Sequence, residues 1–78
     1  MTRYTIVIDP EPDGSAFNVF VPALPGCYTW GETVEEALHM AREAITGHIA
    51  ALMAQGETVP VEKAAPFVTG VDIDVPAA

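Results

Sequence analysis

The sequence contains few of the residues on which enzymes and nucleic-acid-binding proteins depend. Among its 78 residues are one cysteine and three basic residues, against eleven acidic residues, so that the formal net charge is −8. A single cysteine excludes an internal disulfide framework and suits a reducing compartment. An acidic chain repels a phosphate backbone, because it lacks the Lys/Arg patch that counterion release requires. We therefore expect no direct binding of nucleic acid, and a basic protein as the natural partner.

Long apolar runs and targeting segments are missing too. The uncharged runs fall well short of the roughly 20 apolar residues that a membrane span requires. Met1–Asp9 has a single basic residue and an acidic end, unlike a secretory signal. We expect a cytoplasmic protein that does not associate with membranes. Half of the residues are hydrophobic, which is enough for one small packed domain over residues 1–78.

Alternating hydropathy and turn residues predict three short strands in the first part of the chain. Tyr4–Asp9 and Ala16–Val21 alternate with period two, and the Pro/Asp/Gly-rich segment between them favours a hairpin. Pro22–Gly26 interrupts the alternation, since neither of its prolines can donate to a ladder. Cys27–Trp30 is then the third strand.

One long amphipathic helix is predicted from Val34 to about Gln55, with Gly56 as its terminator. Thr33-Val34-Glu35-Glu36 fits a capping box, in which Thr33 accepts from the Glu36 amide and the Glu36 carboxylate accepts from the Thr33 amide. At 100° per residue, one apolar stripe contains Val34, Leu38, Ala41, Ile45, His48, Ile49 and Leu52.

A fourth strand is predicted near the end of the chain, because Val71–Val75 alternates cleanly and Pro76 ends it. The element order is then βββαβ, and the right-handed crossover favours a parallel final pairing. This order predicts an α+β fold, in which one helix covers one face of a small sheet.

The acidic residues are candidate metal ligands, because this strand order matches the start of a ribonuclease-H-like core. Nucleases with that core hold two metals between carboxylates. Asp9 ends the first strand and Asp13 lies in the hairpin. Glu36 is assigned to the helix cap, however, and Glu43 projects away from the apolar stripe. Cys27 has no basic neighbour in sequence, so we expect a small buried hydrophobe. We predict no enzyme and no catalytic, metal or cofactor site; a vestigial metal-dependent nuclease is the less favoured alternative.

A surface for a protein partner is the better-supported expectation. A sheet covered by a helix on one side leaves its other face and its edges open, which predicts a homodimer or higher oligomer through that face or an edge. Aromatic groups and the acids of the first hairpin are the candidate contact residues. They are Asp9, Glu11, Asp13, Phe20, Tyr28 and Trp30, with Val7 on the same face as the aromatic residues.

Residues 21–45 read VPALPGCYTWGETVEEALHMAREAI. They contain L-P-G-C, a threonine two residues later, G-x-T, E-E-A and A-x-E-A. With this pattern, the sequence resembles the HicB-like antitoxin family. The hairpin before the pattern and the QGETVP after it also fit, so that the resemblance covers nearly the whole chain. The fitting residues with an expected structural role are Pro25, Gly26, Cys27, Thr33 and Glu36.

The resemblance implies a degenerate ribonuclease-H-like domain that binds a small, basic HicA-like toxin. Such a toxin cleaves messenger RNA with a histidine, and the antitoxin neutralises it by covering that active site. Longer members carry a C-terminal DNA-binding domain; with two residues after Pro76, we expect a single HicB-like domain over residues 1–78 without one. An orphan homo-oligomeric module without a toxin is the alternative.

Overall fold

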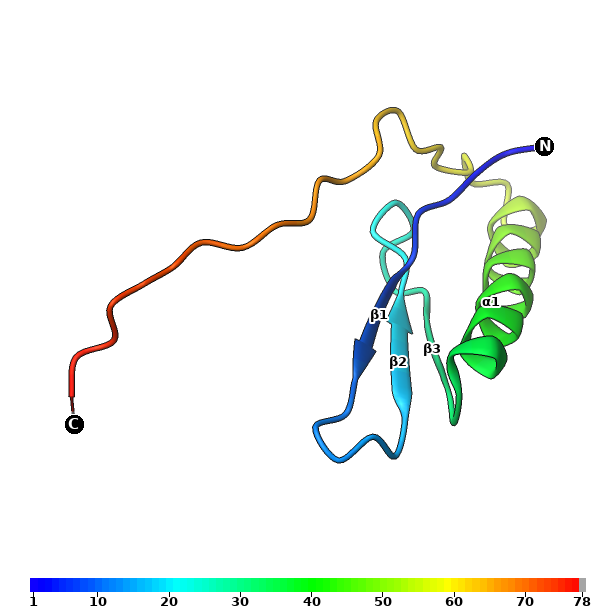
Figure 1. Cartoon of the computed structure of the whole chain (residues 1–78). Coiled ribbons are helices and arrows are strands. Elements are labelled where there is room, and N and C mark those ends of the chain that lie inside the picture. The colour runs from blue at the N-terminus through cyan, green and yellow to red at the C-terminus, as the bar shows by residue number, and fades with distance from the viewer. Residues whose placement is uncertain (78) are drawn as a thin grey trace.

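The computed structural model describes residues 1–77 and contains a three-stranded sheet and one helix (Figure 1). The strands are β1 (Val7–Pro10), β2 (Phe17–Phe20) and β3 (Tyr28–Gly31), and the helix is α1 (Val34–Ala54). All strand pairs are antiparallel in the order β1-β2-β3. The α+β class and the hairpin between the first two strands are confirmed.

The core lies between the sheet and the first turns of α1. Val19 stands in the central strand, where it pairs with Ile8 of β1 and Thr29 of β3. Its side chain is buried with Ala37 and Ala41 of the helix, and Ile8 packs against the same cluster. Because the two helical residues are alanines, the helix axis can approach the sheet closely.

Gly31 at the end of β3 allows the closest approach between sheet and helix. A Cβ atom built on this residue would lie 2.8 Å from the Ala37 Cα and would also clash with the Ala37 nitrogen. Real Cβ atoms do not come this close to backbone, so the position accepts only a residue without a side chain. The G-x-T spacing therefore joins a close contact to a helix cap two residues later.

The helix begins at the predicted cap, with one difference in its hydrogen bonds. Thr33 is extended, and its Oγ1 accepts from the Glu36 N–H at 3.0 Å. The Glu36 carboxylate accepts from the Glu32 N–H at 3.1 Å, and not from the Thr33 amide as expected. The Thr33 bond satisfies an amide of the first turn, where no carbonyl of the helix is available, and the Glu36 bond holds the residue before the cap.

Loss of the Thr33 hydroxyl is expected to cost about 1 kcal/mol of stability, because one amide of the first turn then loses its partner. Urea denaturation of Thr33→Ala followed by circular dichroism measures this. Thr46→Ala is the matched control, since Thr46 lies in the middle of the helix and its side chain is exposed. Alanine is the better helix former at such a position, so no loss is expected. Equal losses in the two variants would contradict the capping role.

The helix ends as predicted, at a glycine with a positive φ. Gly56 has φ +71°, and its N–H donates to the Met53 carbonyl at 3.0 Å. The Glu57 N–H donates to the Leu52 carbonyl at 2.9 Å, which completes a Schellman motif. The last carbonyls of α1 thus find partners before the chain turns away.

The predicted apolar stripe is confirmed for Ala41, Ile45 and Ile49 and is wrong for its first two members. Val34 and Leu38 were expected in the core, but they are 46% and 43% exposed. The fully buried residues are Ala37 and Ala41, and Ile45 packs against a second cluster further along. At the start of the helix, the close contact with the sheet buries Ala37 in place of Val34 and Leu38.

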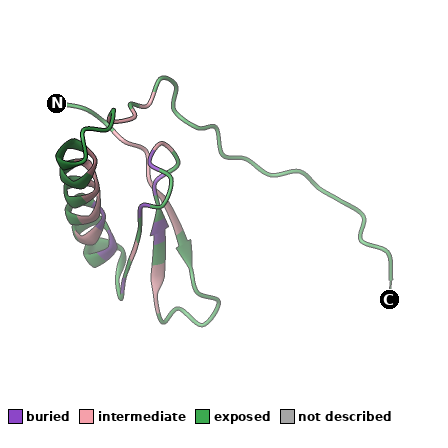
Figure 2. Cartoon of the chain, turned by 180° about the vertical axis from the view of Figure 1, so that it is seen from behind, coloured by how far each residue is buried: buried purple, intermediate pink, exposed green. Residues whose placement is uncertain are grey.

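The predicted fourth strand is not formed among the described residues. Beyond Gly56 the described chain has neither helix nor strand up to residue 77, and residues 67–77, here called the tail, extend away from the body (Figure 1). Figure 2 shows the tail exposed along its described length. The radius of gyration is 15.5 Å, against about 11–12 Å for a compact chain of this length. Alternation marks a segment able to pair, but pairing also requires an edge within reach.

Candidate functional site

The open face is the side of the sheet that α1 does not cover. Because successive side chains of a strand point to opposite sides, and Val19 points to the helix, its neighbours Asn18 and Phe20 point to the open face. The strand register assembles two adjacent rows there. They are Val7–Phe20–Tyr28 and Asp9–Asn18–Trp30.

Three aromatic side chains dominate the open face. Phe20, Tyr28 and Trp30 are 41%, 72% and 54% exposed. They come from two neighbouring strands, so their rings lie over adjoining parts of the sheet. A cluster of exposed aromatic groups differs from scattered surface residues, because it offers contiguous apolar area with polar handles on Tyr and Trp.

The three acids of the first hairpin are not equivalent. Asp9 lies in the second row of the open face, and the Glu11 Oε1 accepts from the Asn18 Nδ2 at 2.7 Å. Asp13 instead accepts from the Ser15 N–H at 2.9 Å, and its bonds to Ser15 lower the pKa of its carboxyl group. Asp13 thus forms part of the turn. Asn18, which sequence reasoning did not include in the site, connects the turn to the face.

The loop between β2 and β3 explains the L-P-G-C pattern. The Leu24 N–H donates to the Val21 carbonyl, and the Cys27 N–H donates to the Leu24 carbonyl, both at 3.0 Å. Gly26 has φ +85° and follows Pro25, which is the arrangement of a type II turn. Two successive turns reverse the chain and bury the Leu24 side chain completely.

Cys27 is a packing residue in this loop. It is buried with Val21 and Leu24, and its burial raises the pKa of the thiol. A protonated, inaccessible thiol is a poor nucleophile. The reading of Cys27 as a small buried hydrophobe is confirmed.

The described residues contain neither a metal-binding cluster nor a membrane-spanning helix. Within residues 1–77, no group of three or more His, Cys, Asp or Glu side chains is placed to hold a metal ion. His39 Nε2 lies 3.4 Å from Glu43 Oε1, and both side chains are well exposed. In the same part of the chain, no helix combines the length and the apolar character needed to cross a membrane.

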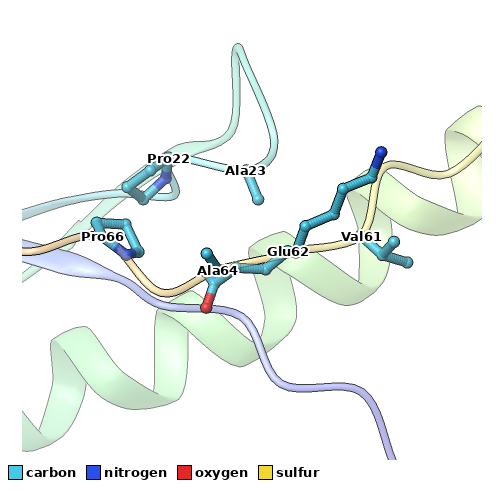
Figure 3. Close-up of a pocket in the computed structure, with 7 residues that line it drawn as sticks. Pro22, Ala23, Val61, Glu62, Ala64 and Pro66 are labelled. Carbon is cyan, nitrogen blue, oxygen red and sulfur yellow. The ribbon is translucent and has the colours of Figure 1, made fainter.

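A shallow hollow lies between the β2–β3 loop and the connector, residues 57–66. In Figure 3, Pro22 and Ala23 of the loop face Ala64 and Pro66 of the connector. Glu62 also lines this hollow, but the Thr5 N–H and the Thr5 Oγ1 donate to its two carboxylate oxygens, each at 2.8 Å.

One further bond joins the N-terminal segment to the connector. The Tyr4 hydroxyl donates to the Pro60 carbonyl at 2.6 Å. We call these three bonds of Tyr4 and Thr5 the clasp. Because the clasp already uses both oxygens of Glu62, the hollow is better explained as a junction of chain segments than as a ligand site.

Known proteins resemble this chain in structure or in sequence. The N-terminal domain of the antitoxin HicB from Burkholderia pseudomallei superimposes with a TM-score of 0.68 and 39% sequence identity, over 80% of this chain and 72% of that one. A UPF0150 protein of Thermoplasma acidophilum is 44% identical over 62 residues, covering 80% of this chain and 88% of the relative. A UPF0150 protein of Synechocystis is 41% identical over 60 residues, covering 77% and 75%.

A family model also matches most of the chain. The model of the family described as the HicB-like antitoxin of bacterial toxin-antitoxin systems matches residues 4–69. The match includes all three strands, the type II turn, the capped helix and the clasp. The chain is therefore a member of the HicB-like antitoxin family.

Proposed function

We propose that this protein binds and neutralises a small, basic HicA-like ribonuclease through the open face of its sheet. The observation that carries the proposal is the aromatic cluster of Phe20, Tyr28 and Trp30 beside the Asp9 carboxylate, on a face that no described element covers. Family membership supports a toxin as the partner in general; the HicA-like identity is part of the proposal.

The chemistry of the open face suits such a target. A toxin that cleaves RNA must present cationic groups to phosphates, and an acidic domain competes for these groups. Tyr and Trp are the residues that most often supply large binding energies at the centre of an interface. Asp9 and Glu11 then attract the toxin, the aromatic rings exclude water from the contact, and the toxin's active site is covered. The role requires no catalysis and no cofactor by the antitoxin.

Two further expectations belong to the same proposal. The toxin's substrate is messenger RNA, so the antitoxin acts in the cytoplasm. The net charge of −8 disfavours direct binding of nucleic acid by the domain itself. The alternative is an orphan module that uses the same open face for another protein.

The test combines growth rescue with binding kinetics. Co-expression with the toxin is expected to relieve its growth arrest, and Trp30→Ala is expected to weaken binding by roughly 30-fold, mainly through faster dissociation. Asp9→Lys should instead slow association and flatten its salt dependence, because the charge acts before contact. Surface plasmon resonance with purified toxin at several salt concentrations separates the two effects.

Met53→Ala is the matched control, since Met53 is 66% exposed on the helix and lies off the open face. It is expected to leave the affinity unchanged. Persistent growth arrest although both proteins are made would rule out the antitoxin function. An equal loss of affinity from Met53→Ala and Trp30→Ala would contradict the open face as the interface.

A further inference from the structure

The outer edge of β1 is an unpaired strand edge. The Glu11 N–H donates to the Ala16 carbonyl at 2.9 Å, which fixes the phase of the β1–β2 ladder. Residues of an antiparallel pair alternate in the direction of their backbone groups. Val7 and Asp9 therefore direct these groups toward β2, and Ile8 directs its N–H and C=O toward the free edge. β1 ends the sheet, and no strand of the described chain pairs with this edge.

A groove lies between α1 and the N-terminal segment that leads into β1. Its apolar lining consists of Tyr4 and Ile6 on one side and Leu38, Ala41 and Ile45 of α1 on the other; Arg3, Arg42 and Thr46 line it as well. Leu38, which the sequence placed in the core, lines this groove and is 43% exposed. An added strand would find backbone groups at the edge and an apolar surface on its helix side.

The tail has the pattern that this groove requires. Val71, Ile73 and Val75 alternate with Asp72 and Asp74, and the three apolar residues are each at least 73% exposed. Placed along β1, such a strand turns its apolar side chains to the groove and its two carboxylates to the open-face side. The edge and the tail are thus complementary. In the isolated chain the edge has unpaired backbone groups, and the tail has exposed apolar side chains.

The path of the connector directs the tail away from its own edge. The clasp holds Glu62 against Thr5, and the chain then passes the β2–β3 loop at Pro22 (Figure 3). Pro66 has a fixed φ and keeps Ala65 extended, which disfavours a sharp reversal at the exit. The tail continues outward past β1 and gives the molecule a long dimension of 52 Å (Figure 1).

We propose that two copies of this chain exchange their tails, so that Val71–Val75 of each adds a fourth strand to the β1 edge of the other. A two-fold exchange satisfies both edges and both tails with one type of contact. The βββαβ order of the sequence is then completed between two chains. This inference concerns self-association and does not depend on the identity of any toxin.

Charge gives the exchanged dimer a salt dependence of its own. Each chain carries a net charge of −8, and the tail brings Asp72 and Asp74 to the side of the sheet that holds Asp9. Salt screens this repulsion, so the dimer is expected to strengthen as salt is added. Binding to a basic toxin is expected to weaken under the same conditions, which separates the two interactions experimentally.

Sedimentation equilibrium of the full-length chain tests the exchange. We expect a dimer for the wild type, and at least about tenfold weaker dimerisation for Ile73→Asp and for Leu38→Glu, since each places a charge in the apolar contact. Thr69→Asp adds the same charge to the tail outside the alternating segment, and Val34→Glu adds it to an exposed position of α1 that does not line the groove. These two controls are expected to dimerise like the wild type.

Circular dichroism is the control for folding, and all four variants are expected to retain the helix signal. A wild type that is monomeric at several hundred micromolar would overturn the exchange, and a loss of stability in Ile73→Asp would then place the tail on its own chain. A dimer that persists in Ile73→Asp and Leu38→Glu but dissociates in Trp30→Ala would also overturn it, in favour of pairing through the open face.

Discussion

Replacing Gly31 with alanine is expected to destabilise the domain by on the order of 3 kcal/mol, at the upper end of the usual cost of overpacking. The new methyl group would meet the backbone of Ala37 at distances that no side-chain adjustment can relieve. The helix must therefore move away from the sheet, and the contact of Ala37 and Ala41 with Val19 is opened as well. Urea denaturation followed by tryptophan fluorescence gives the change in unfolding free energy.

Gly47→Ala is the matched control, because it adds the same methyl group inside the helix. Nothing lies within 4 Å of a Cβ built at Gly47. This substitution is therefore expected to stabilise the protein by about 1 kcal/mol through helix propensity alone. If Gly31→Ala were as stable as the wild type, the close contact between β3 and α1 would be wrong.

Leu24→Ala is the second substitution with a large expected effect, a loss of about 2–5 kcal/mol. Leu24 is completely buried and packs with Val21 and Cys27 inside the two-turn loop. Removing its side chain leaves a cavity that the turn of Pro25 and Gly26 cannot close, because the turn is held by its own hydrogen bonds. Chemical denaturation again provides the measurement.

Leu38→Ala removes the same atoms from a side chain that is 43% exposed. We expect a loss below about 1 kcal/mol for this variant, measured at protein concentrations low enough to keep the chain monomeric. Similar losses for the two leucines would indicate that Leu38 belongs to the core after all.

The local features of this fold could be predicted because each depends on neighbours in sequence. The hairpin turn, the Thr33 cap and the Gly56 terminator involve residues no more than a few positions apart. Their chemistry is therefore visible in short windows of sequence. The open face followed from the period of two along each strand, which placed Phe20, Tyr28 and Trp30 together before any pairing was known.

The features that were missed depend on contacts between distant segments. The clasp joins Tyr4 to Pro60 and Thr5 to Glu62, and no local pattern indicates these partners. The exposure of Leu38 follows from how far the helix extends over the sheet. The tail has strand-like alternation, but whether it pairs is decided by where the connector leaves the body.

The motif residues and the open face occupy different parts of the molecule, and this separation bears on how family membership should be interpreted. Pro25, Gly26 and Thr33 build the loop and the cap, where backbone geometry leaves little choice of residue. Phe20, Tyr28 and Trp30 lie on the open face, where they are at least 41% exposed and the fold constrains their identity less. Two members could therefore share every motif residue and still recognise unrelated partners. A change of specificity would need only substitutions on the exposed rows, at less cost to folding.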